Sequence, residues 1–351
     1  MIIGCDFHPR FQQIAYVDTE TGEYGERRLS HAEEAERFYR FVARRGIRVG
    51  VEATGNFRWF RRLLEELGGE LVLGDAAVIR VLCPRRQKTD KRDARHLLHL
   101  LMEDRFPAVW QPPAENERLR QLLWHRSSLV RMRTRVENQL DSLAKNEGLV
   151  GSRRWSGRRR AEVEGLRLEG WYAERRKDLL SVLDGLQERI RPLEEAVRAA
   201  AEGDAEARLL MTHPGVGPAV SLAYVLVIGD WQRFPRGKHV ASYLGLIPSE
   251  DSSGDRRRLG HISKQGNSML RWLLVQAATI AQRYDARWHR QYVRLSMSKH
   301  HGVAKLAIAH KLAIRLYWML RSGQEYEQVM ECGSHAGQSV CPNGCGSTPR
   351  T

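Results

Sequence analysis

The chain has 351 residues, of which 42% are hydrophobic and 28% charged, and its formal net charge is +15. This length and hydrophobic content allow two or three domains with apolar cores. The longest apolar run, AVSLAYVLVIG, is too short to cross a bilayer, and MIIGCD lacks the cationic start of a signal peptide, so we expect neither a membrane-spanning segment nor a signal peptide. The excess of Lys and Arg is typical of nucleic-acid-binding proteins, although anionic membranes attract basic surfaces equally.

The first part of the chain predicts an α/β domain with acids at the ends of two strands. MIIGCD is an apolar run of strand length that ends at Asp6, and IRVGVE alternates as a strand does and ends at Glu52. Between them, FQQIAYVD and EYGERRL flank a Thr-Gly turn, and an amphipathic stretch follows at 31–45. The order of three strands, a helix and a fourth strand predicts an RNase H-like domain.

Two further acids lie at the start of a predicted helix. In KTDKRDARHLLHLL, Asp90 begins the helix, and Asp93 lies three residues on, on the same face. Mg²⁺ prefers oxygen ligands in octahedral geometry, and two such ions about 3.5–4 Å apart can stabilise the attacking and leaving oxygens of a phosphoryl displacement. The four acids Asp6, Glu52, Asp90 and Asp93 therefore predict a nuclease site with two Mg²⁺ ions, although capping or solvation explains any single one equally well.

The middle of the chain predicts two long helices with a basic segment between them. Apolar residues recur at helical spacing from Glu115 to about Glu147 and again from Leu179 to Ala201, so we expect an antiparallel coiled coil. RRWSGRRR, between the helices, can clasp phosphates and stack on an unpaired base, but a solvated basic hairpin tip is an equally good interpretation. The candidate nucleic-acid-binding residues in this segment are Arg153, Arg154, Trp155, Arg158, Arg159 and Arg160.

The following segment, THPGVGPAVSLAYVLVIGDW, predicts a helix, a PGVG turn and a second helix. In a helix-hairpin-helix, Gly215 and Gly217 would let backbone N–H groups approach a DNA phosphate, but a plain interhelical turn gives the same pattern. A polar stretch after Pro248 contains a Ser-Ser-Gly tripeptide, which by itself is a common loop sequence. Four nearby cations can offset the charge of a phosphate, namely Arg256, Arg257, Arg258 and Lys264.

The C-terminal residues 323–351 are rich in Gly and Ser, and we expect them to be disordered. They contain Cys332, Cys341 and Cys345 with His335, but the spacing matches no structural zinc pattern, so no metal is assigned there. Five cysteines in the chain, two of them inside apolar segments, fit a reduced cytoplasmic protein.

Several motif blocks resemble the insertion-sequence-110 family of DEDD transposases. They are GCDFH, GVEATGNF and KTDKRDARHL, then PGVG and YLGLIPSEDSSGDRRRLGHISKQGNSMLRWLLVQAA, and the resemblance extends over about residues 1–322. It implies an α/β RuvC-like DEDD nuclease domain at 1–113 and an otherwise all-α chain. The helical part comprises a coiled-coil linker at 114–203 and a transposase domain at 204–322 that carries a serine loop.

The resemblance also implies a mechanism and partners. Family members carry a nucleophilic serine directly before the glycine of the tripeptide, which corresponds to Ser253, with Ser252 as a competitor. The implied enzyme is a DNA transposase or recombinase that uses Mg²⁺ and a covalent serine–DNA intermediate. Its implied partners are donor and target DNA, a non-coding bridge RNA, and further copies of the chain in a dimer or tetramer, at the bacterial nucleoid. Two alternatives stay open, a Holliday-junction nuclease that uses water and a non-catalytic nucleic-acid-binding protein.

Overall fold

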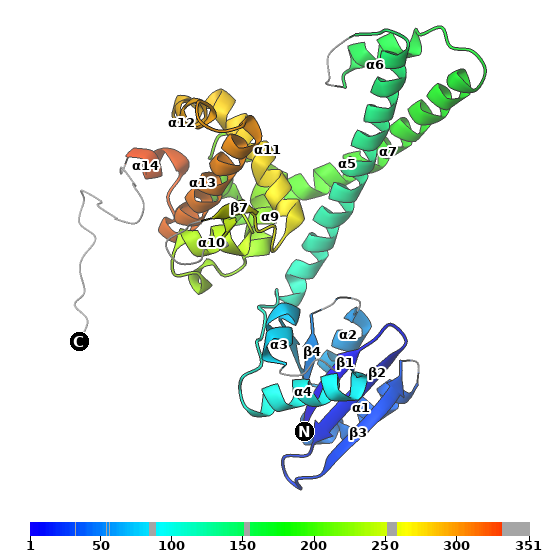
Figure 1. The fold of residues 1–351 in the computed structure, drawn as a ribbon, viewed down its shortest axis with the longest axis vertical. Helices are drawn as coiled ribbons and strands as arrows, with labels where there is room; N and C mark the ends of the chain where they lie inside the picture. The colour runs from blue at the N-terminus through cyan, green and yellow to red at the C-terminus, as the bar shows by residue number, and fades with distance from the viewer. Residues whose placement is uncertain are drawn as a thin grey trace. The chain divides into compact units, whose positions relative to one another are not determined.

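The computed structural model describes residues 1–31, 33–53, 55, 57–83, 89–150, 155–250 and 258–331 (Figure 1). The chain divides into two compact units, Met1–Gln111 and Pro112–Thr351. The first unit is built on a mixed β-sheet, and the described part of the second is mostly helical. The predicted combination of an α/β domain with a mostly helical remainder is confirmed, but the remainder is not all-α, because two short strands pair within it at Pro248–Glu250 and Leu259–Ile262.

A five-stranded sheet in the order β3-β2-β1-β4-β5 forms the centre of the first unit. β1 (Ile2–Phe7), β2 (Phe11–Val17) and β3 (Tyr24–Ser30) are antiparallel neighbours, whereas β4 (Arg48–Glu52) pairs parallel to β1 and β5 (Glu70–Gly74) parallel to β4. The predicted order of three strands, a helix and a fourth strand is present. β5 is not predicted from the sequence, because its apolar segment LVL has only three residues between glycine-containing turns.

Helices cover both faces of this sheet (Figure 1). One apolar core lies between the sheet and α1 (Glu34–Val42) with α2 (Arg58–Glu66). On the other face α4 (Asp90–Met102) packs against β1 and β2, and α3 (Ala76–Leu82) packs against α4. A short 3-10 helix, η1 (Ala43–Arg45), follows α1. The helix that carries two of the predicted acids therefore lies directly on the strand that carries another.

Two long helices begin the second unit, α5 (Ala114–Asn146) and α7 (Trp171–Gly203). Leu140 packs with Leu183 in one apolar cluster, and Leu123 packs with Val197 in another, so the two helices run antiparallel as predicted. Between them in sequence, α6 (Gly157–Glu164) joins the first of these clusters.

The rest of the second unit is a helical body around one large apolar core. Its elements are α8 (Ala205–Met211), α9 (Pro218–Ile228), η2 (Trp231–Arg233), α10 (Gly237–Tyr243), β6 (Pro248–Glu250), β7 (Leu259–Ile262), α11 (Ser268–Tyr284), α12 (Ala286–Ser296), α13 (His301–Ser322) and α14 (Tyr326–Glu331). α9 is buried at every position from Val220 to Ile228, which confirms that the longest apolar run is a core helix. Among the described residues, no helix is both long and apolar enough to cross a membrane.

The prediction that residues 323–351 are disordered is wrong for the first part of that range. Tyr326 and Val329 of α14 are buried in the core, and the Tyr326 hydroxyl donates a 2.6 Å hydrogen bond to Asp285 Oδ2. Two apolar residues three positions apart are too few to show a helical period in the sequence. Residues 332–351, with Cys332, His335, Cys341 and Cys345, lie outside the described residues.

Candidate active site

The first acid, Asp6, stands near the carboxyl end of β1 on the face that α4 covers. Two residues earlier on the same face, Gly4 has no room for a side chain, because a Cβ there would lie 2.3 Å from the Ala94 carbonyl oxygen and 2.3 Å from the Leu98 nitrogen. The backbone of α4 therefore rests on the backbone of β1. Since Ala94 is one helical turn after Asp90, this contact brings the start of α4 to Asp6.

The second acid, Glu52, ends the neighbouring strand. Parallel pairing of Cys5 with Val51 places Asp6 and Glu52, the next residues, at the same edge of the sheet. The Glu52 carboxylate is about one-quarter exposed, and its Oε1 lies 3.9 Å from Arg80 Nε. The two strand ends thus meet as the sequence predicts.

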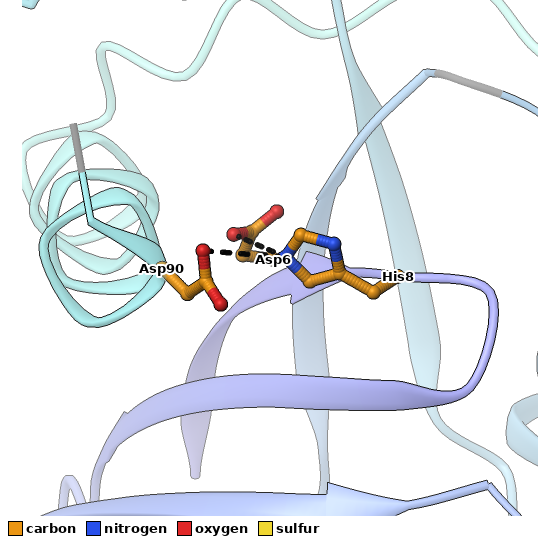
Figure 2. A group of neighbouring side chains, drawn as sticks. All are labelled: Asp6, His8 and Asp90. Atoms are coloured by element: carbon orange, nitrogen blue, oxygen red, sulfur yellow. Dashed lines mark hydrogen bonds and ion pairs between the residues drawn. The ribbon is translucent and has the colours of Figure 1, made fainter.

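Asp6 and Asp90 converge with His8, a residue that is not among the predicted site residues (Figure 2). His8 Nε2 lies 3.0 Å from Asp6 Oδ2 and 3.6 Å from Asp90 Oδ1. One donor atom from each of the three side chains lies within 4.8 Å of the other two. Two carboxylates and an imidazole at this spacing provide donors that divalent cations accept.

The carboxylates of this cluster repel one another electrostatically. Burial raises the pKa of Asp6; the nearby His8 lowers it, and the charges of Asp93 and Asp90 raise it again, with a net upward shift. Asp93, in the first turn of α4, is thus close enough to act on Asp6, although it is outside the three-residue group. A cation among these acids would compensate the unfavourable charge.

Comparison with known proteins covers both units. Residues 207–294 match a family model described as "Transposase IS116/IS110/IS902 family", and residues 3–146 match the DEDD model of IS110, described as a transposase. The chain is 30% identical over 338 residues to a probable family 20 transposase of Pseudomonas aeruginosa, with 91% of this chain and 96% of that protein covered. The chain belongs to the IS116/IS110/IS902 transposase family.

Two other relatives match this IS116/IS110/IS902 family member over about two thirds of its length and of their own. The transposase for insertion sequence element IS1111A of Coxiella burnetii is 28% identical over 262 residues, covering 70% of this chain and 69% of that protein. The pilin gene-inverting protein of Moraxella lacunata is 29% identical over 255 residues, covering 69% of each. The region matched by the DEDD model, residues 3–146, includes all four predicted acids.

The predicted nucleophile of this family member, Ser253, and its competitor Ser252 lie outside the described residues, as do Arg256 and Arg257. The strands before and after this segment, β6 and β7, pair antiparallel. Ser263, the residue after β7, donates its backbone N–H to the Ile247 carbonyl at 2.8 Å. Arg258 is exposed beside this pair, and Lys264 adopts a left-handed backbone with φ of 56°.

Two residues after the serine segment have structural roles. Asn267 caps α11, where its Oδ1 accepts the Leu270 N–H at 2.9 Å. Arg271 donates to the carbonyl oxygens of Leu244, at 3.1 Å, and Gln265. These contacts fix the chain between β7 and α11 to the end of α10.

The PGVG turn joins α8 to α9, and its two glycines differ. Gly215 has φ of 87°, and a Cβ there would lie 2.6 Å from the Ala277 carbonyl oxygen, so this glycine permits close packing on α11. Gly217 precedes α9 and has no neighbour within 4 Å of a Cβ. A side chain at position 217 would therefore meet open space, whereas position 215 is packed against α11.

Arg159, in the basic segment, is 1% exposed and belongs to the protein interior. Its Nη2 donates to Asp141 Oδ1 at 2.6 Å, and its Nη1 donates to Glu162 Oε2 at 3.2 Å. A phosphate has no access to this guanidinium, which corrects the place of Arg159 among the predicted nucleic-acid-binding residues. The basic run alone gives no sign of this burial, because the partner Asp141 lies on α5, 18 residues earlier.

The other described residues of the basic segment are more accessible. Arg158 is 89% exposed and pairs with Glu162 one turn later, whereas Arg160 pairs with Asp184 and Glu164. Trp155 is half-buried against the cluster that joins α5, α6 and α7. Arg153 and Arg154 lie outside the described residues.

Proposed function

We propose that this chain is the transposase of a bacterial insertion sequence, which cleaves and rejoins DNA strands at a metal centre on its RuvC-like first unit. The observation that carries this proposal is the convergence of Asp6 and Asp90 with His8, within residues matched by the family's DEDD model. Family membership makes DNA the substrate. The strand order and the position of α4 support the RuvC-like assignment.

The residues that would hold the cation are Asp6 and Asp90, with Glu52 and Asp93 as further oxygen ligands that allow two Mg²⁺ ions. A bound divalent cation would stabilise the negative charge that develops when a phosphodiester is attacked. The acids are held by backbone contact between β1 and α4, so they keep their mutual position. Their negative charge would otherwise repel the DNA backbone, which makes cleavage dependent on a cation.

Ser253 is the proposed nucleophile. Its hydroxyl oxygen would bond to a DNA phosphorus, the bridging oxygen of one strand would leave, and the serine proton would pass to solvent or a nearby base. The phosphodiester energy is then retained in the serine–DNA link for rejoining. The resemblance of this segment to the family supports the assignment, and Arg258 with Lys264 provides flanking positive charge.

We further propose that three parts of the chain have different functions. Residues 1–113 cleave, 114–203 form a helical linker that binds nucleic acid at its basic end, and 204–322 carry the serine and bind DNA. The residues proposed to contact nucleic acid are Arg153, Arg154, Trp155 and Arg158 at the basic end, and Gly217, Arg256, Arg257, Arg258 and Lys264 in the second part. A bridge RNA and assembly as a dimer or tetramer at the nucleoid complete the proposal, on family resemblance alone.

Strand cleavage of labelled donor DNA, with candidate guide RNA supplied from the element's flanking sequence, tests the metal centre. Asp6→Asn and Asp90→Asn should abolish cleavage while retaining DNA binding, and EDTA should abolish cleavage by the unmodified protein. The matched control is Asp104→Asn, since Asp104 is a 91% exposed acid of the same unit. Wild-type cleavage by the first two variants, or in EDTA, would contradict the metal centre.

Trapping and peptide mapping of protein–DNA adducts tests the serine. An adduct on Ser253, absent from Ser253→Ala, supports the covalent route, whereas an adduct on Ser252 or on a tyrosine overturns that assignment. Metal-dependent cleavage without any adduct would indicate a nuclease that uses water. Binding without cleavage under all divalent ions would indicate a non-catalytic nucleic-acid-binding protein.

A further inference from the structure

His8 has no role in a site made of four acids, yet its ring lies between two of them. Its Nε2 faces both Asp6 Oδ2, at 3.0 Å, and Asp90 Oδ1, at 3.6 Å (Figure 2). The side chain is one-third exposed, so a solvated ion can reach it.

The turn between β1 and β2 holds the ring in this position. The imidazole stacks on the Phe11 ring with centroids 4.5 Å apart and planes at 22°. The backbone N–H of His8 donates to the backbone carbonyl of Phe11 at 3.0 Å. The Arg28 guanidinium carbon lies 3.8 Å from the centroid of the same phenyl ring. Because Phe11 is held between these two groups, the imidazole is directed at the acids before any ion binds.

We propose that His8 is a nitrogen ligand of the cation held by Asp6 and Asp90, and that it shifts the preference of this centre from Mg²⁺ towards Mn²⁺. The inference rests on the proposed metal centre. Mg²⁺ strongly favours oxygen ligands, whereas imidazole binds transition-metal ions well, and Mn²⁺ accepts carboxylates too.

His8 Nε2 makes a hydrogen bond to Asp6 Oδ2, as a histidine that orients one acid would, but its approach to a second acid favours a role as a ligand. An orienting side chain makes a hydrogen bond to a single ligand from outside the donor group. Here one nitrogen approaches carboxylates from two different elements, β1 and α4, and all three donor atoms lie within 4.8 Å of one another. This arrangement places Nε2 among the donors around a shared centre.

Metal binding to the purified full-length chain tests the inference without a cleavage assay. The free Mn²⁺ signal in electron paramagnetic resonance gives the Mn²⁺ affinity, and competition gives the Mg²⁺ affinity. We expect His8→Ala to weaken Mn²⁺ binding at least about tenfold, a typical cost of disturbing a metal site, and to weaken Mg²⁺ binding less. Pulsed resonance should show ¹⁴N coupling to bound Mn²⁺ in the unmodified protein and none in His8→Ala.

Two further variants complete the design. His99→Ala is the matched control, because His99 is exposed on α4 and lies outside the donor group, and it should bind both ions as the unmodified protein does. His8→Asp replaces the nitrogen with oxygens and should raise the affinity for Mg²⁺ relative to Mn²⁺. Thermal unfolding of each variant verifies that it is folded.

Equal weakening of both ions by His8→Ala would make His8 a positioning residue for Asp6 and overturn the inference, as would ¹⁴N coupling that persists in that variant. Failure of the metal centre itself has a different signature. If the unmodified chain binds neither ion, or if Asp6→Asn binds both normally, the proposed function fails together with the inference. If Asp6→Asn loses both ions and His8→Ala loses neither, only the role of His8 is refuted.

Discussion

Replacing Gly4 by alanine tests whether contact between β1 and α4 aligns the acids. The new Cβ would lie 2.3 Å from backbone atoms of Ala94 and Leu98, whereas ordinary contacts begin near 3.4 Å. Backbone atoms cannot rotate aside, so α4 must move by the difference of about 1.1 Å. Such overpacking costs about 1–3 kcal/mol of stability, and a displacement of about 1 Å in a catalytic group can cost about 100-fold in rate. We therefore expect Gly4→Ala to lower cleavage about 100-fold.

Urea unfolding and strand cleavage of labelled DNA, measured on the same preparations, give both quantities. Gly69→Ala is the matched control, because a Cβ there would meet its neighbours at an ordinary 3.4 Å. It should change stability by less than about 0.5 kcal/mol and leave cleavage unchanged. A folded Gly4→Ala variant that cleaves at the wild-type rate would refute the claim that this backbone contact sets the position of Asp90.

Two predictions concern the stability of the second unit. Arg159→Ala should cost about 2 kcal/mol in urea unfolding, because the buried guanidinium loses its charged hydrogen bonds to Asp141 and Glu162, although Asp141 keeps Lys145. Arg158→Ala should cost less than about 1 kcal/mol, and equal effects of the two substitutions would contradict the burial argument. Burial lowers the pKa of His213 to about 4 from its ordinary 6.5, so its contribution to stability is complete above pH 6.5 and is lost as the pH falls towards 4. The full loss in the free energy of unfolding is about 3 kcal/mol. His213→Phe should abolish this dependence of the unfolding free energy on pH, whereas the control His125→Ala, at an exposed residue, should retain it. Identical pH profiles for His213→Phe and the unmodified chain would contradict the prediction.

The elements that carry the four acids are predictable from the sequence because their signals are local. β1 and β4 are apolar or alternating runs that end at an acid, and α4 shows a helical period immediately after Asp90. Parallel pairing then brings Asp6 and Glu52 to one edge without any knowledge of side-chain contacts. The glycines at positions 4 and 50 are paired in register and both face α4, which explains in retrospect why that helix lies so close to the strands.

The parts of the site that the sequence does not reveal depend on contacts between distant segments. The direction of the His8 ring is set by Phe11 and by Arg28 on β3, and only the short Asp-Phe-His spacing hints at it. The burial of Arg159 depends on a partner in α5. Basic runs usually lie in solvent, so the composition of RRWSGRRR favours the opposite interpretation.

The backbone contact at Gly4 also explains why the acids stay close together although their charges repel one another. Asp6, Asp90 and Asp93 repel one another, and in a looser structure α4 would move away and relieve that repulsion. Here α4 already rests on β1 through Gly4, and Leu101 lies over Gly50, so the helix is held in place by the same packing that forms the apolar core of this face. The repulsion therefore persists in the folded protein, where the charges of Asp93 and Asp90 add to burial, the larger cause, in raising the pKa of Asp6. A cation that binds among these acids finds its ligands already in position, so its binding free energy is not reduced by the cost of bringing them together.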